Sequence, residues 1–102
     1  MSRVEPIAYQ KVFHEAVKNG NIQEASRILG ERKDKLNMNW FDKDGETALH
    51  SCCYSGNLEL MKLLVRSGAN VELCNRDGFS CLHLACFYGH REMMLYILNQ
   101  LH

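Results

Sequence analysis

The 102-residue sequence lacks a net charge, because twelve lysines and arginines balance twelve aspartates and glutamates. A chain without net charge has no overall field that would draw it to DNA or to an anionic membrane. Its one basic cluster, Arg32, Lys33 and Lys35, is interrupted by Asp34 and is interpreted as a solvated loop. The charge balance therefore argues against direct binding of nucleic acid or membrane.

Long apolar runs are also missing. No segment approaches the roughly 18 apolar residues of a membrane span, and residues 1–6 lack the apolar stretch of a secretory signal. We therefore expect a protein of the nucleus and cytoplasm, in which the five cysteines are reduced thiols. Their odd number, with Cys52 and Cys53 adjacent, fits a disulfide framework poorly.

Catalytic patterns are scarce in a chain that is long enough for one domain only. There is no Ser-His-Asp or Cys-His order and no phosphate-binding glycine loop. Structural zinc needs two close cysteine pairs, whereas Cys81 and Cys86 are five residues apart and Cys74 stands alone. We therefore expect no enzyme, no small-molecule substrate, no metal and no cofactor.

An internal repeat is the main positive signal. The string DGETALH at 44–50 recurs as DGFSCLH at 77–83, a step of 33 residues, and Gly56 and Gly89 continue the register. A fainter copy, FHEA at 13–16, lies 36 residues before the second copy. About three extra residues therefore separate the first two copies, and they are assigned to residues 31–36.

Each copy carries the signals of a helix pair. Thr47 and Ser80 stand where a hydroxyl can cap a helix start, and Gly56 stands where a helix ends. This pattern resembles the ankyrin repeat, which implies an all-α solenoid of three helix-turn-helix repeats joined by short β-hairpin fingers. We expect an N-terminal arm over 1–8 and an ankyrin domain over 9–102, with repeats at about 9–41, 42–74 and 75–102.

The resemblance assigns structural roles to the repeated histidines and most cysteines. In ankyrin-like repeats the imidazole at the position of His14, His50 and His83 hydrogen-bonds the backbone of the adjoining turn. Small residues occupy the positions of the cysteines listed next, which are therefore expected to pack as small apolar side chains. They are Cys52, Cys53, Cys81 and Cys86.

Aromatic residues are expected on the concave face that ankyrin-like stacks use for binding. The candidates are Trp40, Phe41, Tyr54, Phe79, Phe87 and Tyr88, with Phe41 packed between the fingers. Exposed aromatics on such a face are typical interface anchors. The predicted protein-binding residues are Phe79, Cys86, Phe87, Tyr88, Tyr54, Trp40 and Glu46.

The final helix is nearly apolar around its circumference, from Met93 to Leu101. Terminal repeats normally carry a polar outer face. Two interpretations remain open: an apolar last helix in a trimmed chain, or an open end that continues another ankyrin array.

A closer resemblance, from about residue 12 onward, is to the family of Notch-regulated ankyrin repeat proteins. Phe79 stands where that family has a bulky aromatic residue, and Cys86 where it has a small one beside the binding face. The strings that carry the likeness are FHEAV (13–17), NMNWF (37–41), GNLELMKLLV (56–65), NRDGFS (75–80) and LYI (95–97).

The closer resemblance implies a non-enzymatic adaptor that attenuates Notch signalling. Such proteins bind the ankyrin repeats of the Notch intracellular domain together with the CSL transcription factor, and they lower the level of that domain. They are also tied to Wnt signalling through a lymphoid enhancer factor. The alternative is a generic ankyrin adaptor for another intracellular target, such as a phosphatase, a kinase or a ubiquitin ligase component.

Overall fold

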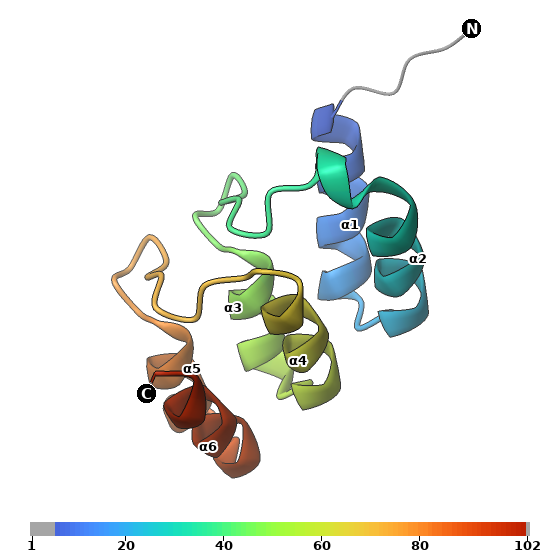
Figure 1. Ribbon diagram of the computed structural model, residues 1–102. Coiled ribbons are helices and arrows are strands. Elements are labelled where there is room, and N and C mark those ends of the chain that lie inside the picture. Colours follow the sequence, from blue (N-terminus) through green and yellow to red (C-terminus); the bar gives the residue numbers. More distant parts are fainter. Residues whose placement is uncertain (1–5, 102) are drawn as a thin grey trace, which may run out of the picture.

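The computed structural model describes residues 6–101, and residues 1–5 and 102 lie outside its described part. Three helix pairs stack in sequence order into a body of 47 × 25 × 24 Å, from blue to red in Figure 1. This confirms the predicted all-α solenoid. The helices are α1 Pro6–Lys18, α2 Ile22–Arg32, the short 3-10 helix η1 Lys33–Lys35, α3 Ala48–Ser55, α4 Leu58–Arg66, α5 Cys81–Phe87 and α6 Arg91–Gln100.

Short polar side chains start the helices. Thr47 and Ser80 accept hydrogen bonds from the backbone N–H groups of the histidines three residues later, as their hydroxyls predicted. Asn21 and Asn57 cap the second helices of their repeats in the same way, at 3.1 Å each. Gly56 ends α3 with a φ of 73°, in the left-handed region that glycine tolerates.

The first repeat begins earlier than predicted. Helix α1 begins at Pro6, so residues 6–8 belong to the helix and not to the predicted arm. Proline suits the first turn of a helix, because its fixed φ is already helical and its missing N–H has no partner there. The rest of the predicted arm, residues 1–5, lies outside the described residues. The extra residues assigned to 31–36 are accommodated by a longer α2 and by η1.

The core lies between the helix pairs and consists of residues that are almost completely buried. Helices α1, α3 and α5 contact one another in a row, and each packs against the second helix of its own repeat. The largest apolar members of this core are Phe13, Leu49, Leu60, Met61, Leu64, Met93 and Ile97.

Three of the cysteines pack in this core as predicted. Cys52, Cys53 and Cys81 are buried, and burial raises the pKa of the Cys52 thiol to about 12, so the thiol stays neutral. Cys86 is exposed, and the prediction that it packs is wrong. It occupies the position of Cys53 one repeat later, where no described helix lies beyond α5 and α6 to cover it.

Two fingers, residues 42–46 and 75–79, project on the same side of the stack (Figure 1). Each is closed by a backbone hydrogen bond, from Asp42 N to Glu46 O at 2.9 Å and from Asn75 N to Phe79 O at 2.8 Å. Within residues 6–101 no strand forms, and a single isolated bridge joins Cys74 to Ser80. The fingers are therefore tight turns, and the pairing of a β-hairpin is reduced to this one bridge at the second finger.

The fingers are tied to each other as well as closed. Arg76 N donates to Gly45 O at 3.0 Å, and the Arg76 guanidinium donates to Lys43 O at 2.7 Å. A bond of this kind also joins the loops behind the fingers, where Asn70 N donates to Asn39 Oδ1 at 2.8 Å. The spacing between neighbouring repeats is thus held by hydrogen bonds as well as by the core.

In residues 6–101 no helix has the length and the apolar character that a membrane crossing needs.

Candidate protein-interaction surface

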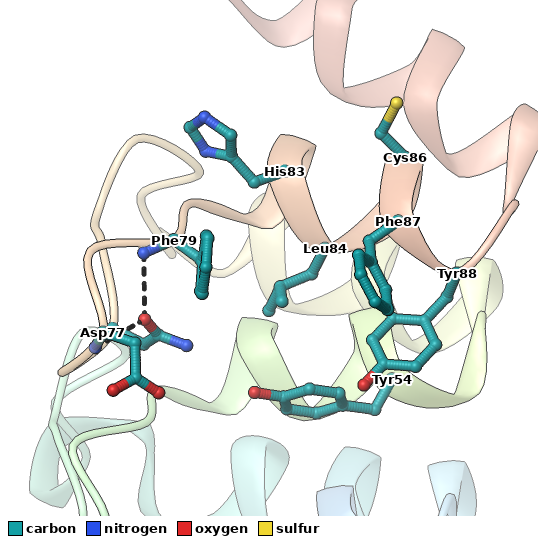
Figure 2. Close-up of a pocket in the computed structure, with 9 residues that line it drawn as sticks. Tyr54, Asp77, Phe79, His83, Leu84, Cys86, Phe87 and Tyr88 are labelled. Atoms are coloured by element: carbon teal, nitrogen blue, oxygen red, sulfur yellow. Dashed lines mark hydrogen bonds between the residues drawn. The ribbon is translucent and has the colours of Figure 1, made fainter.

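An open hollow lies between the second finger and the ends of α3 and α5 (Figure 2). Its volume is about 530 Å³. We call it the aromatic hollow, because four large aromatic side chains dominate its wall. Its lining residues are Tyr54, Asn75, Asp77, Phe79, His83, Leu84, Cys86, Phe87 and Tyr88.

The aromatic rings contact one another edge to face. Tyr88 lies with its ring centre 5.1 Å from that of Phe87 and 5.6 Å from that of Tyr54, both in T-shaped arrangements. Phe87 is 81% exposed, and Phe79 on the finger is 46% exposed. A contiguous patch of apolar side chains that faces solvent is a common mark of a docking surface. Figure 2 shows Phe79, Leu84, Phe87 and Tyr88 gathered around this opening.

Two buried polar residues hold Phe79 in place. His50 Nε2 lies 3.1 Å from the carbonyl oxygen of Phe79, and Thr47 N donates to His50 Nδ1 at 3.2 Å. Because Nδ1 accepts, the proton sits on Nε2 and is donated to Phe79. Burial lowers the pKa of His50, which keeps the ring in this neutral form. Asn75 Oδ1 accepts from Phe79 N at 2.9 Å, so the finger residue is fixed at both backbone groups.

The other two repeated histidines differ from His50. His83 accepts from Ser80 N at 3.1 Å, but no described finger follows to take its other nitrogen. His14 is buried, yet neither of its ring nitrogens makes a hydrogen bond. The residue three positions before it is Lys11, not Ser or Thr, so the hydroxyl partner is missing. The predicted backbone bond is therefore confirmed for His50 and His83, whereas His14 Nε2 lies 3.8 Å from Asp42 Oδ2.

Tyr54 links the aromatic hollow to the first finger. Its hydroxyl donates a hydrogen bond to Glu46 Oε1. Burial, and then this bond, raise the pKa of Tyr54, so the phenol remains a donor. The second carboxylate oxygen, Glu46 Oε2, is buried and accepts no hydrogen bond. Glu46 therefore orients the ring of Tyr54 and leaves an acceptor unused.

The hollow continues along the inner side of the fingers as a groove. Its middle section is lined by Lys18, Asp42, Asp44, Glu46, Ser51, Tyr54 and Ser55. A third section reaches the first repeat and is lined by Lys11, His14, Glu15, Lys18, Trp40, Asp42, Lys43 and Asp44. Neighbouring sections share residues, so we treat the three together as one concave groove.

The predicted binding residues are distributed along this groove unevenly. Tyr54, Phe79, Phe87 and Tyr88 meet in the aromatic hollow, and Glu46 lies in the next section. Cys86 is at the rim of the hollow, and Figure 2 shows its sulfur directed away from the rings.

The remaining two aromatics lie elsewhere. Trp40 is in the section of the first repeat, edge-on to His14 with ring centres 4.9 Å apart. Phe41 is 44% exposed, so the prediction that it packs between the fingers is wrong. Its neighbour Trp40 is half-buried, against His14.

Sequence reasoning missed the polar wall of the groove. Asn75 and Asp77, which line the aromatic hollow, are the 33-residue equivalents of Asp42 and Asp44 in the middle section. The repeat register could have found them, because it places both pairs at the same points of consecutive fingers.

The outer side of α6 is a second exposed apolar area. Leu95, Leu98 and Leu101 are 54%, 42% and 44% exposed, and no described helix covers them. The last repeat thus has the apolar outer side that its sequence predicted.

The chemistry of the groove is that of binding. Among residues 6–101, no group of three or more histidine, cysteine or acidic residues could hold a metal ion. The hollow is open to solvent on one side, and its wall offers rings, hydroxyls and carboxylates that suit a protein surface.

Comparison with known proteins identifies the repeats. A family model described as ankyrin repeats in three copies matches residues 13–102. The Notch-regulated ankyrin repeat-containing protein of Xenopus laevis is 48% identical over 67 residues, which are 65% of this chain and 59% of that protein. The human protein of the same name is 47% identical over 67 residues, with the same two shares. The chain thus spans about three fifths of the length of these relatives.

A third similarity points to another context. Protein phosphatase 1 regulatory subunit 27 of Mus musculus is 33% identical over 60 residues, which are 59% of this chain and 38% of that protein.

Proposed function

Because the chain belongs to the ankyrin-repeat family, we propose that it is a non-enzymatic adaptor that attenuates Notch signalling. It binds the ankyrin repeats of the Notch intracellular domain together with the CSL transcription factor and lowers the level of that domain. A link to Wnt signalling through a lymphoid enhancer factor belongs to the same proposal, as does a place in the nucleus and cytoplasm.

The observation that supports an adaptor most strongly is the exposed aromatic hollow on a rigid finger. Phe79 is fixed by hydrogen bonds to both of its backbone groups, while the residue as a whole is 46% exposed. Rigid aromatic side chains lose little conformational entropy when a partner covers them, which favours their use as anchors. The Notch part of the proposal is supported by the identity of 48% to a protein named for its regulation by Notch.

The proposal is tested by size-exclusion chromatography of this chain with a Notch ankyrin domain, with and without CSL on its DNA site. We expect co-elution in the ternary mixture. Separate elution of all components, with this chain shown to be folded by circular dichroism, would contradict the Notch proposal.

Replacing Phe79 by Glu should weaken binding of this complex at least tenfold while leaving the helical circular dichroism spectrum intact. A carboxylate in the aromatic hollow would have to be desolvated without a partner. The matched control is Phe41→Glu, which changes an equally exposed phenylalanine that lines none of the three groove sections. Equal affinity of the two variants would remove Phe79 from the interface.

A second candidate function is that of an adaptor for another intracellular target. The 33% identity to a protein phosphatase 1 regulatory subunit favours a phosphatase as the first alternative to examine. A pull-down with the folded chain and with its Phe79→Glu variant distinguishes the two candidates. A target that the native chain retains and the Phe79→Glu variant does not would replace the Notch complex as the proposed partner.

A further inference from the structure

The concave groove combines an apolar hollow with an unpaired acidic wall. We propose that it binds a short extended segment of a partner protein, in which an apolar side chain enters the aromatic hollow and neighbouring lysines or arginines lie along the fingers. This inference rests on the proposed function only in that it takes the same surface as the interaction site.

The acidic wall is built by equivalent positions of the two fingers. Asp44 and Asp77 are 33 residues apart, and Asp42 and Glu46 stand beside the first of them. In the middle section of the groove three carboxylates face a single lysine, Lys18. The aromatic hollow contains Asp77 and no lysine or arginine among its lining residues. We call the carboxylates of Asp42, Asp44, Glu46 and Asp77 the acidic band.

In the described part of the chain, three members of the acidic band are left without ion pairs, and the fourth, Asp42, lies 3.8 Å from His14 Nε2 through its Oδ2. Within residues 6–101, none of Asp44, Glu46 and Asp77 takes part in an ion pair. Elsewhere in residues 6–101, Arg27 bridges Glu24 and Glu31 on α2. The nearest arginine of the fingers, Arg76, directs its guanidinium to the carbonyl oxygen of Lys43. A cationic partner would therefore find exposed and unpaired carboxylates at Asp44 and Asp77.

The aromatic hollow determines which apolar residue the bound segment carries. Its rings offer apolar area for one leucine, methionine or aromatic side chain. The faces of Phe87 and Tyr88, which are 81% and 48% exposed, also suit the guanidinium of an arginine. Figure 2 shows these rings at the opening of the hollow, with Asp77 at its finger side.

The aromatic hollow and the acidic band meet at Tyr54. Its ring lines both the aromatic hollow and the middle section, and its hydroxyl is bonded to Glu46 of the acidic band. The apolar anchor and the basic residues must therefore lie within a few positions of each other. A nucleic acid does not fit, because carboxylates repel phosphates.

The charge of the groove differs between its sections, which fixes where the basic residues of the bound segment lie. The section of the first repeat balances Lys11, Lys18 and Lys43 against Glu15, Asp42 and Asp44. Along the groove, acidic residues outnumber basic ones only in the middle section and the aromatic hollow. Basic residues of the bound segment that lie over the first repeat would therefore gain no net electrostatic attraction.

The test is selection of a phage-displayed library of random 12-residue peptides on the immobilised full chain. We expect the enriched peptides to combine an aromatic residue, leucine or methionine with at least two lysines or arginines nearby. Enrichment of acidic peptides, of peptides without basic residues, or of none above background would overturn the inference.

The most enriched peptide is then measured by fluorescence anisotropy against groove variants. Phe87→Ser and the double variant Asp44→Lys, Asp77→Lys should each weaken its binding at least tenfold. Affinity for the native chain should fall as salt is added, because charge pairs are screened. The matched controls are Leu95→Ser and Glu59→Lys, which alter an exposed leucine and an exposed glutamate outside the groove. Equal losses in groove and control variants would overturn the inference.

The outcome is separable from that of the Notch proposal. Peptide binding together with separate elution of the ternary mixture would contradict the Notch proposal and support the groove. Co-elution of the ternary mixture without any selected peptide would do the reverse.

Discussion

His50 shows how a residue type that often carries chemistry serves here to place another residue. Its ring is completely buried, accepts from Thr47 N and donates to the carbonyl of Phe79. The function of the imidazole is to connect the start of α3 with the next finger. The exposed aromatic side chain therefore depends on a buried histidine from the preceding repeat.

This role predicts that stability falls in mild acid. Burial lowers the pKa of His50 and of His14 below the ordinary 6.5, so below that pH the unfolded chain takes up protons that the folded chain does not. The stabilising contribution is complete above the ordinary pKa and is lost as pH falls below it. We expect the unfolding free energy from urea titrations to fall by up to about 1.4 kcal/mol per pH unit for each histidine.

The control for this prediction is His50→Gln. Its amide keeps a donor for the Phe79 carbonyl but cannot take up a proton in this range. The variant should therefore show a shallower fall of stability between pH 7 and pH 5. An unchanged slope would mean that His50 does not contribute to the pH dependence.

Leu49, next to His50, carries the largest expected effect of a single truncation. It is 1% exposed in the row of first helices. Replacement by alanine should reduce the unfolding free energy by about 2–5 kcal/mol, because apolar area is lost and a cavity remains. Urea unfolding followed by circular dichroism measures this. Leu95→Ala, at a site that is 54% exposed, should change it by less than about 0.5 kcal/mol; a loss below about 1 kcal/mol for Leu49→Ala would contradict its place in the core.

At the scale of elements, the starts of α3 and α5 could be predicted and the form of the fingers could not. A hydroxyl before an apolar helical pattern is a local signal, and Thr47 and Ser80 act as expected. Whether a finger forms strands depends on how many residues pair across it. Here only Cys74 and Ser80 form a bridge, which amino-acid type alone does not determine.

The contact between the fingers predicts opposite effects of two Gly→Ala changes. Gly45 has a φ of 74°, and an added Cβ would lie 2.6 Å from Cβ of Arg76, so Gly45→Ala should destabilise the chain by about 1–3 kcal/mol. Gly30 lies inside α2 with nothing within 4 Å of an added Cβ, so Gly30→Ala should stabilise it by about 0.5–1 kcal/mol. Thermal unfolding of both variants measures this, and shifts of the same sign would refute the finger contact.

At the scale of the whole molecule, stability depends on neighbours. Each repeat is a helix pair that buries its apolar side only against the next pair. A chain ending at Cys74 lacks the residues that cover His50 and Cys53, so we expect it to lose helical signal per residue and cooperative urea unfolding. A shortened chain that unfolds cooperatively at the same urea concentration would show that the first two repeats are independent.

The same dependence explains which part of the site could be predicted. The repeat register was sufficient to place Tyr54, Phe79, Phe87 and Tyr88 on one face. It could not show that Cys86 is uncovered, because this depends on the absence of a described helix beyond α6. Nor could it show that Phe41 is exposed and Trp40 half-buried, since both are large aromatic residues at adjacent positions.

The packing of Trp40 against His14 gives the molecule a built-in optical reporter. It is the only tryptophan of the chain, and it lies at the junction of the first and second repeats, far along the groove from the aromatic hollow. Its emission follows the polarity around that junction, whereas the far-ultraviolet signal follows the α-helices along the whole stack. Coincidence of the two transitions would identify a stack that melts as one unit, and separation would identify a repeat that frays by itself.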